Sequence, residues 1–198
     1  TAFDGSPDVP RPRPFPEGLL GDAKFREGFA VLEKLGLSFD AYIYHPQLHE
    51  LADLANAFPG VTIILNHVGG PLGVGPYASK RDQIFEEWKD SMTAVAASPN
   101  VVVKVGGLVM PVCGFDWHER AMPTTSGSLA QATAPYYLHC IEQFGPNRCM
   151  FESNFPVDKI ACSYTVLWNA FKRLAHDFSP SEQAALFHDT ATRFYRLS

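Results

Sequence analysis

Short, largely apolar runs alternate along the chain with longer segments in which apolar residues recur at helical spacing. The short runs cover residues 39–44, 61–66, 101–105 and 148–152, and the helical pattern covers 22–35, 47–58, 79–97, 130–144 and two or three segments within 162–196. Short apolar runs rich in β-branched residues are typical of strands that are buried on both faces of a parallel sheet. The order of these elements therefore predicts an α/β fold in which right-handed crossovers join parallel strands.

The pattern divides the chain into an N-terminal arm and one domain. Residues 1–21 are rich in proline, glycine and aspartate, which predicts an extended surface arm, and residues 22–198 form the predicted domain. Asp22 is expected to cap the first helix, and Gly36 to end it. Four strands are too few to close a (β/α)8 barrel. We therefore expect either a small open sheet or one half of a barrel.

Polar residues follow two of the predicted strands at the point where each strand ends. The second strand is followed by His67 and a glycine-rich turn, and the fourth by Glu152, Ser153 and Asn154. In α/β proteins, ligands bind and chemistry occurs at the carboxyl ends of the strands. These two strand ends, which carry imidazole, carboxylate and amide groups, predict an active site.

Composition narrows the class of protein. The 198 residues carry a formal charge of −5, which disfavours nucleic acid and anionic membranes as partners. No apolar stretch has the length of a membrane span or of a signal-peptide core. The four cysteines lack metal-ligand spacing, so we expect reduced, buried thiols in a cytoplasmic protein.

Three motifs in sequence order resemble the amidohydrolase-related family. They are NHVGGP at 66–71, VKVGGL at 103–108 and MFESNFP at 150–156. Members of that family are (β/α)8-barrel hydrolases, which include lactonases and 2-pyrone-4,6-dicarboxylate hydrolase. The matching strands are the fifth to eighth there, so the resemblance implies the C-terminal half of a TIM-like barrel. The family's first strand carries a His-x-His metal motif, and no two histidines of this chain are two positions apart.

The resemblance implies roles for His67 and Asn154. His67 matches a family histidine that binds a divalent metal, zinc or manganese here, or polarises the substrate carbonyl. A histidine that is simply hydrogen-bonded within a loop is the alternative. Asn154 stands where most relatives have the aspartate that activates water or contacts the metal. An amide cannot accept a proton at neutral pH, so Asn154 can orient a water but cannot be the base.

Glu152 is the first candidate for the displaced carboxylate. Side chains two positions apart in a strand share a face, so Glu152 is expected on the same side as Asn154. The alternative is that Glu152 forms a core ion pair with Lys104 of the neighbouring strand and has no role in chemistry. Asp158, which lies beyond the proline turn, is a second candidate base or otherwise a loop-capping residue.

Further candidates are expected to contact the substrate. His45 ends the first strand as His67 ends the second, with a structural role as the alternative. Trp117, His118 and Arg120 lie in the longest internal loop, and Arg120 could hold a substrate carboxylate unless the loop is an ordinary surface segment. Lys104, near the end of the third strand, is also a candidate for substrate binding.

We therefore expect a hydrolase that adds water to the carbonyl of a small-molecule substrate, a lactone or another cyclic ester or amide. The rival expectation is a catalytically incomplete half-barrel. Such a chain would need the missing N-terminal half, or a second copy of itself, as its partner, because its sheet edges would be unpaired.

Overall fold

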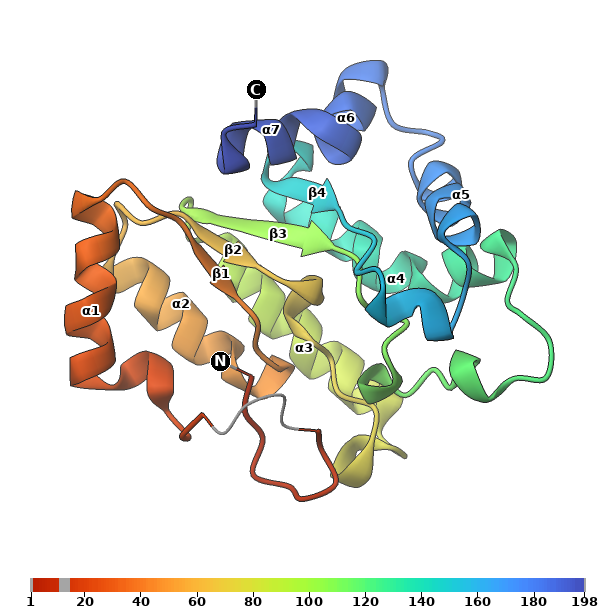
Figure 1. The fold of residues 1–198 in the computed structure, drawn as a ribbon, viewed down its shortest axis with the longest axis horizontal. Helices are drawn as coiled ribbons and strands as arrows, with labels where there is room; N and C mark the ends of the chain where they lie inside the picture. Colours follow the sequence, from red (N-terminus) through yellow and green to blue (C-terminus); the bar gives the residue numbers. More distant parts are fainter. Residues whose placement is uncertain (1, 11–14, 198) are drawn as a thin grey trace.

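The computed structural model describes residues 2–10 and 15–197, and within them a single parallel sheet. Its four strands lie side by side in the order β1, β2, β3, β4, as Figure 1 shows. They span Phe39–Ala41 (β1), Ile63–Leu65 (β2), Val101–Val105 (β3) and Cys149–Phe151 (β4). Because spatial order equals sequence order and every pair is parallel, each connection crosses over the sheet. The expected α/β class with parallel strands is confirmed.

The helices lie close to their predicted positions. Asp22 caps the first helix as expected, because its Oδ1 accepts a hydrogen bond from the backbone N–H of Phe25 at 2.8 Å. The fourth helix begins at residue 126, earlier than the predicted 130, because Thr125 caps it by accepting from the backbone N–H of Ser128. The helices span Ala23–Lys34 (α1), Leu48–Ala57 (α2), Arg81–Ala96 (α3), Ser126–Phe144 (α4), Tyr164–Leu174 (α5), Pro180–Ala184 (α6) and Thr190–Tyr195 (α7).

The first strand is shorter than the predicted 39–44. Its pairing with β2 ends where Ala41 lies beside Leu65. Beyond that point the chain bonds to a loop instead, since the N–H of His45 donates to the carbonyl of Gly70. The segment after β1 is thereby turned toward the glycine-rich loop that follows β2.

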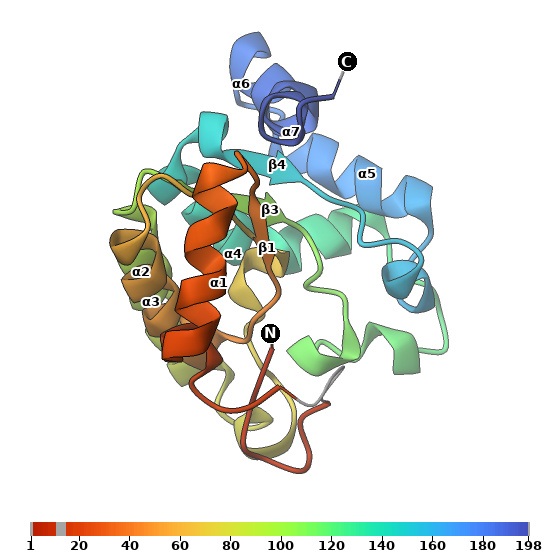
Figure 2. The ribbon, with the colours of Figure 1, turned by 60° about the vertical axis from the view of Figure 1, so that its left-hand side comes forward.

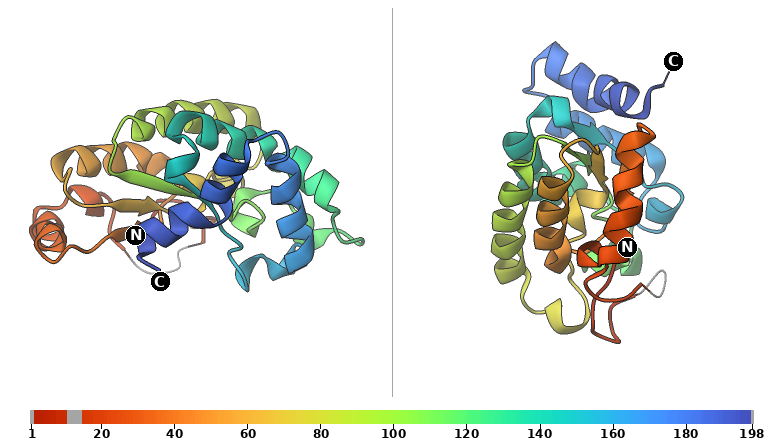
Figure 3. Two further views of the ribbon diagram at one scale, coloured as in Figure 1. Left: turned by 90° about the horizontal axis from the view of Figure 1, so that it is seen from above. Right: turned by 90° about the vertical axis from the view of Figure 1, so that its left-hand side faces the viewer.

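The two faces of the sheet are covered differently. Helices α2, α3 and α4 lie along one face, where alternate strand residues such as Leu65 and Val103 join the main core. On the other face, a smaller cluster of Ile64, Val102 and Met150 packs against α7, which crosses the sheet there (Figure 3). In Figure 2, α7 is seen nearly end-on above the sheet. The C-terminal helix therefore covers this face of the sheet at the level of Ile64, Val102 and Met150, and the polar residues lie beyond it, at the carboxyl ends of the strands.

The described part of the N-terminal segment lies beside the loops that follow β1 and β2. The backbone N–H of Phe3 donates to the side-chain oxygen of Gln47, and the hydroxyl of Tyr77 donates to Asp4. Ala2 and Val9 are buried. None of the helices in the described ranges is both long and apolar enough to cross a membrane.

Candidate active site

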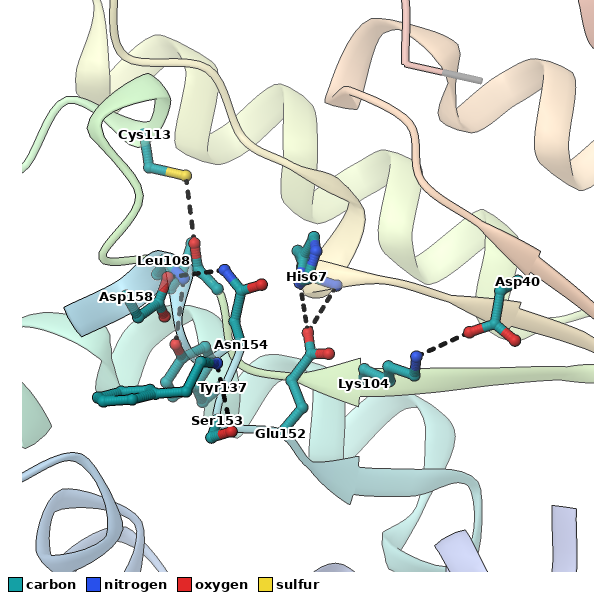
Figure 4. Close-up of polar contacts among 12 residues, drawn as sticks. Asp40, His67, Lys104, Leu108, Cys113, Tyr137, Glu152, Ser153, Asn154 and Asp158 are labelled. Atoms are coloured by element: carbon teal, nitrogen blue, oxygen red, sulfur yellow. Dashed lines mark hydrogen bonds and ion pairs between the residues drawn. The ribbon is translucent and has the colours of Figure 1, made fainter. Parts of the chain in front are cut away.

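The His67 imidazole and the Glu152 carboxylate meet at the carboxyl end of the sheet (Figure 4). Oε1 of Glu152 accepts from Nδ1 of His67 at 2.6 Å and from the backbone N–H of the same residue at 3.0 Å. The side chains are only 14% and 15% exposed. In such a poorly hydrated place a charge-assisted hydrogen bond is stronger than at a surface.

Two glycines allow this pair to form. His67 follows β2 and Glu152 follows β4, so the two side chains must meet across the end of β3, which lies between them. A Cβ on Gly106 would lie 2.5 Å from Cγ of Glu152, and a Cβ on Gly107 would lie 2.7 Å from Nδ1 of His67. Any side chain at either position would therefore push one partner away.

The backbone at His67 is held in a rarely populated conformation. His67 has φ 54° and Val68 has φ 45°, a region that non-glycine residues seldom adopt. The indole N–H of Trp88 donates to the carbonyl of Val68 at 2.7 Å and helps to hold the turn. Such residues cost about 1–3 kcal/mol each and cluster at active sites. The strain points to a functional role for this turn.

The hydrogen bond to Glu152 determines the tautomer of His67. An ionised carboxylate can only accept, so in the neutral form of the ring the proton lies on Nδ1 and the lone pair lies on Nε2. The ring of Tyr42 packs edge-on against the imidazole with centroids 5.2 Å apart. The nitrogen left with a lone pair can bind a metal or take a proton from water.

A second polar pair, Asn154 and Asp158, lies beside the first. Nδ2 of Asn154 donates to Oδ1 of Asp158 at 2.6 Å, and Oδ2 of Asp158 is buried without a hydrogen-bond partner. Burial raises the pKa of Asp158 to about 7, although the hydrogen bond from Asn154 and the nearby His67 oppose that rise. The structure thus brings together all four residues predicted for catalysis.

The expected alternative for Glu152, an ion pair with Lys104, is wrong. Lys104 instead pairs with Asp40 of β1 at 2.7 Å, and the hydroxyl of Tyr195 donates to the same carboxylate at 2.6 Å. Glu152 is held by the two N–H groups of His67. The ammonium group of Lys104 is directed toward Asp40 on β1 and away from the carboxyl ends of the strands (Figure 4).

His45 is held inside the loops. It is buried, and its Nδ1 accepts from the backbone N–H of Leu72 at 3.2 Å. Burial lowers its pKa to about 4, so the ring is neutral at physiological pH. No hydrogen bond among the described residues joins His45 to the His67–Glu152 pair.

Trp117, His118 and Arg120 lie together in a different part of the rim. They line a pocket of about 390 Å³ that Lys159 also lines. The ring of Phe115 stacks on Trp117 with centroids 4.7 Å apart and an interplanar angle of 3°, which orders the loop. The long loop is therefore a structured wall of this pocket.

The described residues do not form a metal site by themselves. No three His, Cys, Asp or Glu side chains in the described ranges gather closely enough to hold an ion. His67 offers one nitrogen, with Glu152 behind it in the position of a carboxylate that orients a ligating histidine. Asn154 supplies an amide where a carboxylate ligand would be needed. A zinc or manganese ion would need further donors.

Three residues of this site had no predicted role. Gly106 and Gly107 were part of a strand-end motif, but nothing in the sequence showed that side chains of two other strands cross above them. Tyr42 was placed in a strand. Its position two residues before the predicted strand end was the only signal that its ring would lie near the rim.

Comparison with known proteins identifies the family. The amidohydrolase family profile matches residues 8–197. The chain belongs to the amidohydrolase family. It is 43% identical to protein y4mH of Sinorhizobium fredii over 174 residues, which are 88% of the chain. It is 28% identical to an L-fucono-1,5-lactonase of Burkholderia multivorans over 180 residues, which are 90% of the chain. A crystal structure of a Burkholderia multivorans amidohydrolase with bound zinc superposes on 91% of the chain with a TM-score of 0.78 and 28% identity.

This amidohydrolase-family chain spans about half the length of these relatives. The matched segment covers 52% of the Sinorhizobium protein, 58% of the lactonase and 60% of the crystallised amidohydrolase. The four-stranded sheet is consistent with part of a TIM barrel. The lactonase match agrees with the class of reaction that the motifs suggested.

Burial of Asp158 predicts how stability depends on pH. Its pKa is about 7 in the folded chain and near 3.8 when exposed, so the folded state keeps a proton that the unfolded state loses as pH rises. Stability should therefore fall between about pH 4 and pH 7 and level off above. The unfolding free energy of Asp158→Asn minus that of the wild type, measured in urea, should increase by roughly 2–3 kcal/mol from pH 5 to pH 8. A difference that stays constant over this range would contradict the burial argument.

Proposed function

We propose that this chain carries out the hydrolase chemistry of its family, adding water to the carbonyl of a small lactone or another cyclic ester or amide. The observation that supports this most is the pairing of His67 with Glu152 at the strand ends. It provides an oriented base in a place with little water. The 28% identity to an L-fucono-1,5-lactonase supports a lactone as the substrate.

In the proposed mechanism His67 is the base and Glu152 holds it in place. Glu152 keeps the proton on Nδ1, so Nε2 can take a proton from the attacking water. The carboxylate then stabilises the imidazolium, which returns the proton to the leaving oxygen as the ring opens. The sequence suggested Glu152 as the base, but its Oε1 already accepts two N–H bonds, which favours the positioning role. Since the described residues lack a cluster of metal donors, no step of this mechanism passes through a metal.

We also propose that the chain corresponds to the fifth to eighth strands of a TIM-like barrel. The order of its motifs and its coverage of about half of each relative support this. β1 pairs with β2 alone among the described strands, and the exposed Val31, Leu35 and Leu37 lie on and just after α1, near that edge. The proposed partner for this edge is an N-terminal half-barrel or a second copy of the chain.

The proposed edge contact predicts self-association when no other half is present. The purified chain should have the mass of a dimer by light scattering, because the apolar residues beside β1 favour burial. Leu37→Lys should shift it toward the monomer. Leu138→Lys, at an exposed apolar position on α4, which lies along a face of the sheet and not at an edge, is the control and should leave the dimer intact. A wild-type monomer at every concentration would contradict the partner proposal.

Replacing the carboxylate of Glu152 tests the proposed mechanism. Glu152→Gln should lower kcat/KM for L-fucono-1,5-lactone by about 10²–10⁴, since the amide cannot stabilise the imidazolium. Hydrolysis is followed by acid release, and circular dichroism checks the fold. Glu86→Gln, on the exposed face of α3, serves as the matched control. Near-normal turnover by Glu152→Gln, or no lactone hydrolysis by the wild type, would count against the proposed function.

A further inference from the structure

The orientation of Asn154 is fixed by its neighbour. Its Nδ2 donates to Oδ1 of Asp158 at 2.6 Å. Figure 4 shows the amide nitrogen of Asn154 directed toward Asp158 and the side-chain oxygen on the side of His67. An amide carries its donor and its acceptor on opposite sides of one carbon, so fixing one group fixes the other. Residue 154 therefore presents an acceptor, and not a donor, to the candidate active site.

Asp158 is itself held rigidly. Its backbone N–H donates to the carbonyl of Asn154, and its own carbonyl accepts from the N–H groups of Ala161 and Cys162. The residue has 0% exposure, so it cannot touch a substrate in the open part of the site. Among the described residues no Lys or Arg pairs with its carboxylate. Burial of an unpaired carboxyl group is costly, and the hydrogen bond from Asn154 is the side-chain contact that offsets part of this cost.

We propose that Asp158 is a positioning residue that holds the Asn154 amide with its oxygen toward His67. In this orientation the oxygen accepts a hydrogen bond from the attacking water or from the alcohol released on ring opening. At pH 8.5, above the pKa of about 7, the carboxylate is ionised, so it accepts hydrogen bonds and donates none, which enforces the orientation. This inference rests on the proposed hydrolase function and assigns separate roles within it. His67 transfers the proton, and the Asn154–Asp158 pair orients the oxygen of the attacking water or of the released alcohol.

The side chains around Asp158 are compatible with this role. Among the described residues, Asn154 is the one side chain that hydrogen-bonds to its carboxylate, and the other oxygen, Oδ2, has no partner. The ionisable groups that face it come from every element packed around it: His67, Cys113, Tyr137, Glu152 and Cys162. Burial raises the pKa values of Cys113 and Cys162, so these thiols stay neutral. The orientation of Asn154 is thus set by Asp158 rather than by competing donors.

Exchanging the two side chains separates positioning from mere packing. In Asp158→Asn at pH 8.5, the neighbouring amide can either donate or accept, so the acceptor at 154 is no longer fixed. We expect kcat to fall about tenfold to hundredfold while KM changes less than about threefold, because a positioned hydrogen bond in the transition state is lost. The exchanged variant, Asn154→Asp with Asp158→Asn, restores a fixed acceptor, since the new amide donates to the new carboxylate. Its kcat should recover to within a few-fold of the wild type.

The kinetic experiment has a matched control and a clear contrary result. Asp189→Asn removes a carboxylate that is 65% exposed and should leave kcat unchanged. If Asp158→Asn keeps the wild-type kcat, or if the exchanged variant is no better than Asp158→Asn, the positioning role is overturned. Circular dichroism confirms that each variant is folded.

A spectroscopic measurement tests the orientation without turnover. The side-chain amide signals of Asn154 in ¹⁵N NMR spectra of the full chain should shift in Asp158→Asn and stay in place in Asp189→Asn. Unchanged signals in Asp158→Asn overturn the inference whatever the kinetics show. Signals that shift in a chain with no lactone hydrolysis support the orientation and count against the proposed function alone, so the two failures are distinguishable.

Discussion

The site depends on one hydrogen-bonded contact, that between the His67 imidazole and the Glu152 carboxylate across the end of β3. A carboxylate at this depth is stable only with partners, and here one oxygen accepts two N–H groups from a single residue. The contact fixes the tautomer of the imidazole. It also joins β2 to β4, which are not neighbours in the sheet.

Several features of the fold follow from that contact. The third strand must end in glycines, because any Cβ at 106 or 107 would occupy the space of the pair. The turn after β2 adopts positive φ angles so that both N–H groups of His67 face the carboxylate. Away from these strand ends, α7 packs on one face of the sheet, and the hydroxyl of its Tyr195 donates a hydrogen bond to Asp40. Apolar packing of α7 and the Lys104–Asp40 ion pair thus support this face of the sheet, while the polar groups gather at the carboxyl ends of the strands.

Periodicity was sufficient to predict the order of elements, since short apolar runs and helical spacing are local properties of the chain. The cluster of His67, Glu152 and Asn154 was predictable for the same reason, because parallel strands bring their carboxyl ends to one edge. The partner of Lys104 was not predictable. The alternation of residues along a strand gives the face on which a side chain lies. A long side chain such as Lys104 can still reach carboxylates on different strands of that face, and here it pairs with Asp40 instead of Glu152.

Boundaries and burial were harder to predict than order. The start of α4 depended on a cap at Thr125 rather than on apolar spacing, and β1 ended early because its continuation bonds to a loop. The complete burial of Asp158 depends on how the turn after β4 folds back, which no local pattern specifies. A local cap decided the start of α4, whereas tertiary contacts decided the end of β1 and the burial of Asp158.

The state of the His67 ring tests the central claim most directly. ¹⁵N NMR at alkaline pH distinguishes a protonated ring nitrogen from an unprotonated one. The account predicts that Nδ1 carries the proton and Nε2 the lone pair. An imidazole that carries its proton on Nε2 would leave Glu152 facing a lone pair, and would contradict the proposed pairing together with the chemistry built on it.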